Sequence, residues 1–234
     1  MERETAVNML LFDLDDTLVD DGVATRLAAE ALFQHYWPEQ QAQALQHWQR
    51  ALKLYYPAFL QGQMSAAEMR QARAREVLQQ PQLSAAQAEQ VFEYFMQQYI
   101  ASTQLYPDTL ACLKELQQQG WRLALISNGP EEMQQRKVKA AGLVDFFEFV
   151  LTAEVAGAAK PKLDIFKHAL RLANLPAAQC CYIGDHLEKD AQAAFAAGLS
   201  SIWLQRTDSA EVVAWPYPDV NWKVACLAQL KQCI

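Results

Sequence analysis

Two carboxylates stand two positions apart at the end of a short apolar stretch near the start of the chain. Residues Leu10–Asp20 read LLFDLDDTLVD, so Asp13 and Asp15 directly follow the apolar residues. Successive side chains of a strand point to opposite faces, and the two acids would therefore project the same way. Like charges held this close raise the pKa of a carboxyl unless a cation or a proton is shared. The pair indicates a metal site, an acid/base pair, or both.

Polar side chains also follow later apolar stretches of the chain. They are Ser127 and Asn128 after Arg122–Ile126, Lys160 in a loop of small residues before Pro161, and Asp185 and Asp190 after Cys180–Ile183. The carboxyl ends of parallel strands meet at one edge of a sheet, where open α/β folds place their chemistry. We therefore expect these residues to converge with the two acids of the first stretch.

Phosphoryl transfer is the chemistry that these residue types support. A carboxylate such as Asp13 can act as a nucleophile and form an aspartyl-phosphate. A divalent cation held by Asp13 and Asp185 would offset the charge repulsion, and oxygen ligands suit Mg²⁺. Lys160 and Ser127 could hold the remaining phosphoryl oxygens. Asp15 could protonate the leaving alcohol and then deprotonate the attacking water.

Four motifs in order resemble those of the haloacid dehalogenase-like (HAD) hydrolase superfamily. They are FDLDDTL, LISN, the lysine of AKPKLDIF, and IGDHLEKD followed by AFAAG. The resemblance implies that Asp13 is the nucleophile and Asp15 the general acid/base. It further implies phosphate binding by Ser127, Asn128 and Lys160, and Mg²⁺ binding by Asp13, the backbone carbonyl of Asp15, Asp185 and, directly or through a neighbour, Asp190.

The second acid of the first motif favours one branch of this superfamily. Haloacid dehalogenases proper look different at the position of Asp15, because they do not use the same acid/base chemistry, so an acid here favours a phosphatase. Asp16 stands where many relatives have glycine. His186 follows the acid of the fourth motif, where a small polar residue is more usual, and is expected to be a bystander more readily than a catalytic group.

Composition limits the other classes of function. The chain has 234 residues, 52% of them hydrophobic, with a formal net charge of −7, which argues against binding to a nucleic acid polymer. Met1–Asn8 lacks an apolar signal segment, and no apolar run is long enough to span a bilayer, so we expect a cytoplasmic protein. The five cysteines lack CxxC spacing and are expected to be free thiols, with Cys180 and Cys181 in the core.

The expected fold is α/β, with a Rossmann-like, doubly wound parallel sheet and an inserted helical cap. Residues 1–20 and 104–234 alternate short apolar runs with helical patterns and are assigned to the core. Residues 21–103 read as helices only and resemble the C1 cap of the superfamily. The predicted strands are Val7–Phe12, Arg122–Ile126, Phe149–Leu151, Cys180–Ile183 and Ser201–Leu204. A closing helix is expected from Trp222 onward.

Several of the candidate residues have an ordinary structural interpretation as well. Ser127 and Asn128 could cap the helix that begins near Pro130, and Asp190 could complement a helix dipole. Lys162 rivals Lys160 as the phosphate ligand. Within the insert, Trp48, Tyr55, Tyr56 and Phe59 are expected to be packing residues rather than a stacking platform, and Arg70, Arg73 and Arg75 a solvated helix face.

The sequence therefore predicts a Mg²⁺-dependent phosphomonoesterase acting on a small phosphorylated metabolite, such as a nucleoside monophosphate, FMN or a sugar phosphate. The alternatives are a phosphomutase or a 2-haloacid dehalogenase of the same fold, or a non-catalytic binding protein. The identity of the substrate is expected to depend on side chains of the insert.

Overall fold

The computed structural model describes residues 7–206, 213–214 and 219–234, so most of the polar Met1–Asn8 segment lies outside the described residues. The chain forms two compact units. One comprises residues 1–20 and 105–234, and the other comprises residues 21–104. Each unit is described by itself.

The first unit is built on a seven-stranded sheet within the described part of the chain. Its order is β3-β2-β1-β4-β5-β7-β6, and every neighbouring pair is parallel except β6 and β7. The strands are β1 Met9–Phe12, β2 Arg122–Ser127, β3 Val150–Thr152, β4 Cys180–Gly184, β5 Ser200–Leu204, β6 Val213–Ala214 and β7 Trp222–Val224. The prediction of a doubly wound parallel sheet is confirmed.

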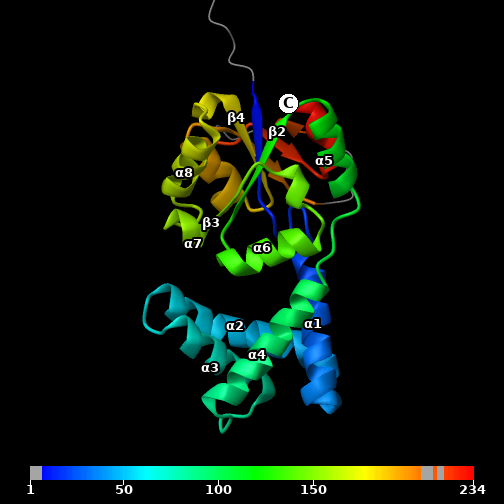
Figure 1. The fold of residues 1–234 in the computed structure, drawn as a ribbon, viewed down its shortest axis with the longest axis vertical. Coiled ribbons are helices and arrows are strands. Elements are labelled where there is room, and N and C mark those ends of the chain that lie inside the picture. Colours follow the sequence, from blue (N-terminus) through cyan, green and yellow to red (C-terminus); the bar gives the residue numbers. More distant parts are fainter. Residues whose placement is uncertain (1–6, 207–212, 215–218) are drawn as a thin grey trace, which may run out of the picture. The chain divides into compact units, whose positions relative to one another are not determined.

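Helices cover both faces of this sheet, with α5 and α8 on opposite sides (Figure 1). The helices of the unit are α5 Thr109–Gln118, α6 Glu131–Ala140, α7 Ala153–Ala156, α8 Leu163–Ala173 and α9 Ala193–Ala196. Strand β1 is buried on both sides, as expected of a central parallel strand. Leu10 packs in the same apolar cluster as Leu113 of α5, whereas Leu11 packs in a second cluster with Phe166 of α8. Two separate cores thus fix β1 from both faces.

The second unit is helical throughout. It contains α1 Asp21–Tyr36, a 3-10 helix Pro38–Gln43, α2 Ala44–Leu60, α3 Ala66–Leu78 and α4 Ala85–Ala101. Ser65 and Ser84 each form a capping box, in which the serine side chain accepts a backbone N–H and the residue three positions later bonds back. The 3-10 helix lies between α1 and α2 and runs directly into α2.

Two further expectations within the second unit had different outcomes. Trp48 is buried and stacks on Phe95, as the packing interpretation predicted. The prediction of a solvated arginine face is wrong for Arg73, which is 6% exposed. Its guanidinium lies 4.4 Å from the centroid of the Trp48 ring, because α3 turns this face toward α2 and α4. Burial lowers the pKa of Arg73 to about 10.

The end of the chain differs from the predicted closing helix. Trp222–Val224 forms β7, which pairs in parallel with β5, and only Leu227–Gln232 is helical, as a 3-10 helix. Backbone hydrogen bonds to β5 outweigh the local helical pattern, a competition between local and tertiary structure that a sequence window does not contain. Between β4 and β5, a π-helix over Leu187–Gln192 is followed by α9.

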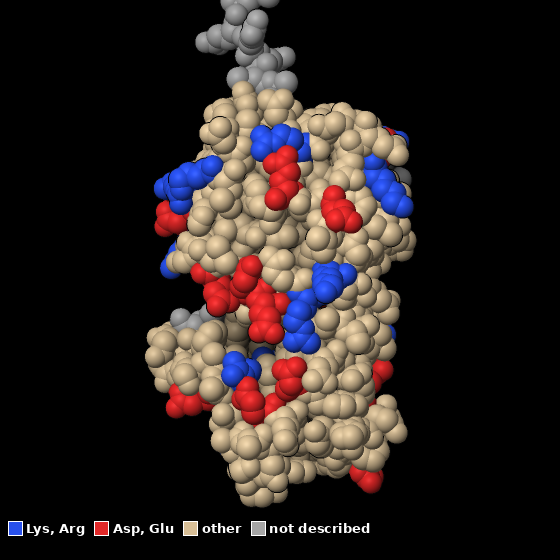
Figure 2. Space-filling view, viewed as in Figure 1, with Lys and Arg blue, Asp and Glu red and all other residues tan. Residues whose placement is uncertain are grey.

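The cysteine prediction is confirmed: all five are free thiols, and Cys180 and Cys181 are buried in β4. Burial raises the pKa of Cys180 to about 11. Acidic and basic side chains are interspersed on the face shown in Figure 2. Within the described residues, no helix combines the length and the apolar character that a membrane span needs.

Candidate active site

Asp13 lies where β1 ends, between the ends of its two neighbours. β1 pairs with β2 on one side and with β4 on the other, so the chain changes direction across the sheet at β1. Such a switch point opens a crevice at the carboxyl ends of the strands. The backbone N–H of Asp13 donates to the carbonyl oxygen of Ile183 at 2.9 Å, which continues the β1–β4 register by one residue. The Asp13 side chain is thereby directed to the edge at which β4 also ends.

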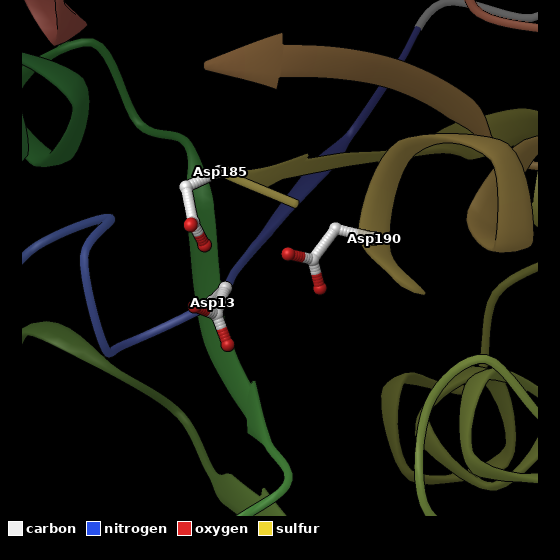
Figure 3. A group of neighbouring side chains, drawn as sticks. All are labelled: Asp13, Asp185 and Asp190. Carbon is white, nitrogen blue, oxygen red and sulfur yellow. The ribbon is translucent and has the colours of Figure 1, made fainter. Parts of the chain in front are cut away.

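Three carboxylates meet at this edge of the sheet. Oxygen atoms of Asp13, Asp185 and Asp190 all lie within 4.8 Å of one another, and the side chains point toward a common space (Figure 3). Asp13 and Asp190 are buried, and Asp185 is half-buried. Carboxylate oxygens at this spacing are the donor set that a hard divalent cation prefers.

Lys160 joins two of these carboxylates from the loop before α8. Its Nζ lies 2.6 Å from Oδ1 of Asp13 and 2.6 Å from Oδ1 of Asp190. It also donates to the hydroxyl of Tyr182 at 2.7 Å. Lys162 is exposed instead, so the structure places Lys160 and not its rival in the cluster.

The charges of the cluster do not balance. Burial alone would lower the pKa of Lys160, but Asp13 and Asp190 outweigh it and the net shift is upward, so the ammonium stays protonated. Burial raises the pKa of Asp13, Lys160 opposes that shift, and Asp190 adds to it. Burial, followed by the charge of Asp190, raises the pKa of Asp185 to about 6. One lysine facing three carboxylates leaves an excess of negative charge that a further cation would offset.

Backbone and side-chain donors fix the orientation of Asp185. Its backbone N–H donates to Oγ1 of Thr17 at 3.1 Å, and its carbonyl accepts from the indole of Trp203 at 2.7 Å. The hydroxyl of Thr17 lies 3.3 Å from Oδ2 of Asp13 and 3.5 Å from Oδ1 of Asp185. Thr17, which is fully buried, therefore connects the first and fourth motifs.

The absence of a side chain at Gly184 leaves space for Asp190. A Cβ atom added to Gly184 would lie 2.6 Å from both Cβ and Cγ of Asp190. Asp190 accepts from the backbone N–H of His186 through Oδ2 at 3.0 Å and from the Tyr182 hydroxyl through Oδ1 at 3.1 Å. Asp190 lies in the first turn of the helical segment Leu187–Gln192, as the helix-dipole interpretation expected, and its carboxylate also belongs to the cluster.

The two acids of the first motif have different partners. Asp16 has a φ of 58°, in the left-handed region that favours glycine, which gives a physical reason for the glycine that many relatives carry there. The carboxylate of Asp15 is held by α6: it is ion-paired with Lys137, and its Oδ2 accepts from Nε2 of Gln134 at 2.8 Å. The side chain of Asp15 is 31% exposed.

Ser127, at the end of β2, and Asn128, directly after it, have different partners. Ser127 ends β2 and is buried, and its hydroxyl accepts from Gln134 at 2.8 Å and from the backbone of Gly129 at 3.3 Å. The side chain of Asn128 bonds the backbone of Lys160 in both directions, at 2.7 and 2.9 Å, and so fixes the lysine loop. Neither Ser127 nor Asn128 caps α6, so the capping interpretation does not hold; the carboxylate of Glu154 accepts the backbone N–H of Glu131 at the start of this helix instead. Phosphate binding by these residues stays a prediction.

Sequence reasoning did not single out four residues of this site: Thr17, Gln134, Lys137 and Tyr182. Thr17 stands inside the quoted FDLDDTL motif and could have been found there. Tyr182 lies in an apolar strand, where an aromatic side chain suggests packing. Gln134 and Lys137 are three positions apart, on one face of α6, but nothing local distinguishes them from surface residues. His186, in contrast, uses Nδ1 to accept from the backbone of Lys189 at 3.3 Å, a local turn contact.

Comparison with known proteins finds similar sequences and similar folds. A phosphoserine phosphatase from Thermus thermophilus is 28% identical over 227 residues, which cover 86% of this chain and 89% of the relative. The HAD-hydrolase YfnB from Bacillus subtilis, solved with magnesium bound, superposes with a TM-score of 0.75 at 24% identity, covering 97% of this chain and 98% of that one. A 2-haloacid dehalogenase from Pseudomonas syringae pv. Tomato has a TM-score of 0.70 at 27% identity, covering 97% of both chains.

The family model of haloacid dehalogenase-like hydrolases matches residues 7–198, which is most of the chain. The match spans the helical insert between β1 and β2, in the position of the C1 cap of that superfamily. The chain belongs to the haloacid dehalogenase-like hydrolase family.

Proposed function

We propose that this protein is a Mg²⁺-dependent phosphomonoesterase that hydrolyses a small phosphorylated metabolite through an aspartyl-phosphate. The observation that carries the proposal is the cluster of Asp13, Asp185 and Asp190 around Lys160 at the switch point of the sheet. It combines a buried nucleophile, a fixed ammonium and uncompensated carboxylates. Substrate selection is assigned to the helical insert, residues 21–103, acting as the cap.

The donor chemistry fits magnesium. Asp13 and Asp185 offer carboxylate oxygens, and Mg²⁺ is commonly held by one or two carboxylates together with water and substrate phosphate. The backbone carbonyl of Asp15 is the third proposed protein ligand, and Asp190 lies close enough to bind the ion or to orient its ligands. When bound, the ion supplies positive charge that offsets the repulsion between the phosphate and Asp13.

The proposed reaction has two displacement steps. In the first, a carboxylate oxygen of Asp13 forms a bond to phosphorus while the ester P–O bond breaks, and Asp15 gives its proton to the leaving alcohol. In the second, Asp15 takes a proton from water as the water oxygen attacks phosphorus, which releases inorganic phosphate and restores Asp13. Lys160 and Ser127 are proposed to hold phosphoryl oxygens through both steps.

Asp15 supports the phosphatase over the dehalogenase. Both classes occur among the similar proteins, so the fold does not decide between them. Hydrolysis of a phosphate ester needs a proton for the alcohol, and Asp15 places a second carboxyl beside the nucleophile to provide it. The proposed substrate is a nucleoside monophosphate, FMN or a sugar phosphate. The proposed setting is the cytoplasm.

The test is phosphate release from a generic aryl phosphate and from a panel of phosphorylated metabolites, with Mg²⁺ and with chelator. Turnover should require Mg²⁺ and fall by a factor on the order of 10⁴ or more in Asp13→Asn, which removes the nucleophile. Asp164→Asn is the matched control, since this carboxylate is exposed and should leave turnover unchanged. Halide release from a 2-haloacid without added metal, or full turnover in Asp13→Asn, would overturn the proposal.

A further inference from the structure

The face of α6 that meets Asp15 carries two buried polar side chains that the proposed reaction does not use. Gln134 and Lys137 are both 0% exposed. Lysine is almost never fully buried unless it is paired, because removing an ammonium from water is costly. Lys137 forms an ion pair with Oδ1 of Asp15, which is 122 positions earlier in the chain.

Gln134 connects two residues of the proposed machinery. Its Nε2 donates to Oδ2 of Asp15 at 2.8 Å and to Oγ of Ser127 at 2.8 Å. Both N–H bonds of the amide are therefore used, one on the proposed acid/base and one on the proposed phosphate ligand. A turn of α6 thus holds one carboxylate oxygen of Asp15 with Gln134 and the other with Lys137.

The absence of a side chain at Gly129 leaves space for the amide of Gln134. A Cβ atom at that position would lie 2.1 Å from Nε2 of Gln134. The loop between β2 and α6 therefore allows the glutamine amide to reach Ser127 only because residue 129 has no side chain.

We infer that Gln134 and Lys137 are positioning residues, which fix the carboxyl group of Asp15 for proton transfer and couple its orientation to that of Ser127. The inference rests on the proposed function, because it assigns these residues to the same reaction. Both oxygens of Asp15 are bonded on the α6 side, and its side chain remains 31% exposed. A proton donor needs a fixed direction toward the leaving oxygen, and a misplacement of about 1 Å can cost about 10²-fold in rate.

The test compares substrates that do and do not need a proton on the leaving group. With an alkyl phosphate, phosphorylation of the enzyme in Lys137→Met and Gln134→Leu should slow by about 10- to 100-fold with little change in KM. With 2,4-dinitrophenyl phosphate, whose leaving group departs as an anion, the initial burst of Lys137→Met should stay within about threefold of the wild-type rate. The loss in Gln134→Leu should be smaller than with the alkyl phosphate, because only the support of Ser127 is missing. The controls on the same helix are Lys139→Met and Gln135→Met, since both residues are exposed.

Further variants keep the inference testable if Lys137→Met unfolds. Gly129→Ala should displace the Gln134 amide and give the same leaving-group selectivity, and Lys137→Arg should retain more alkyl phosphate activity than Lys137→Met. In an Asp15→Asn background, adding Lys137→Met should have no further effect on the alkyl phosphate rate.

The outcomes separate this inference from the proposed function. Equal losses on both substrates, or no loss on either, in an active wild-type background would overturn the role of Gln134 and Lys137 alone. A wild-type protein without Mg²⁺-dependent turnover would refute the proposed function and the inference together.

Discussion

The ammonium of Lys160 lies 2.6 Å from the carboxylate of Asp13, although 147 positions separate the two residues in the chain. The contact joins the loop before α8 to the end of β1, and both side chains are buried. The same Nζ bonds Asp190, so Lys160 holds two acids that would otherwise repel each other. The stability of the site and its proposed chemistry therefore depend on one cation.

Replacing Lys160 with methionine should lower both stability and activity. The variant leaves Asp13 and Asp190 buried without their cation, and breaking a buried pair in this way costs about 3–5 kcal/mol. We expect urea unfolding in the absence of metal to show a loss of that order, and phosphatase turnover to fall by about 10²- to 10³-fold.

Lys162→Met is the matched control for that variant, because Lys162 is exposed two positions away. Its free energy of unfolding should stay within about 0.5 kcal/mol of the wild-type value. Equal effects of the two substitutions would show that the ion pairs of Lys160 do not matter.

Gly184→Ala should disturb Asp190 without changing any charge. The added methyl group would lie 2.6 Å from Cβ and Cγ of Asp190, so the aspartate must move away from Lys160 and His186. We expect a loss of about 1–3 kcal/mol in the free energy of unfolding and weaker activation by Mg²⁺. Denaturant unfolding and a magnesium titration of turnover measure the two effects. A variant that matches the wild type in both would contradict the tight contact.

Arg73→Met in the helical insert should leave that unit at least as stable. The Nε atom of Arg73 is buried without a hydrogen-bond partner among the described residues, and burial lowers the pKa of the guanidinium to about 10. Losing the contact with the Trp48 ring costs about 2 kcal/mol or more, whereas burying an incompletely bonded charge costs several.

Arg70→Met provides the comparison on the same helix. Arg70 pairs with Glu89 at 2.6 Å in a partly exposed position, so its loss should cost about 1 kcal/mol or less. Urea unfolding of both variants measures these changes in the free energy of unfolding. A loss of several kcal/mol in Arg73→Met would mean that the guanidinium stabilises the insert.

Alkylation should distinguish the buried thiols from the others as the pH rises. Burial raises the pKa of Cys112 to about 12 and that of Cys180 to about 11. Only the thiolate reacts, so at pH 8 these two side chains should resist iodoacetamide in the folded protein. The half-buried Cys226 should be modified first, and all five cysteines should react in denaturant, as mass spectrometry would show.

The raised pKa values of the buried thiols also predict how the free energy of unfolding changes with pH. Thiols whose pKa is raised by folding ionise more readily in the unfolded chain. The free energy of unfolding is therefore unaffected by these thiols below about pH 9 and decreases as the pH rises above that value. Prompt alkylation of Cys180 in the native protein at pH 8 would show that β4 opens.

The sequence by itself determined the order of strands β1 to β5, the helical insert and the acids of the motifs. Apolar runs ending in Asp13, Ser127 and Asp185 identify strands and their carboxyl ends, because hydrophobic period and local residue type are properties of a short window. The resemblance to the superfamily then implied one role for each of these residues, among the roles that its residue type allows. The preference for Lys160 over Lys162 also came from motif spacing.

Only the tertiary structure decided which partners these residues have. The chain after Trp222 forms β7 and not a helix because β5 supplies its hydrogen bonds. Arg73 is buried because two neighbouring helices cover its face. Gln134 and Lys137 resemble surface residues in the sequence, yet they hold Asp15 from more than 100 positions away. Side-chain partners separated this far along a chain are set by packing, and packing is not encoded in any local pattern.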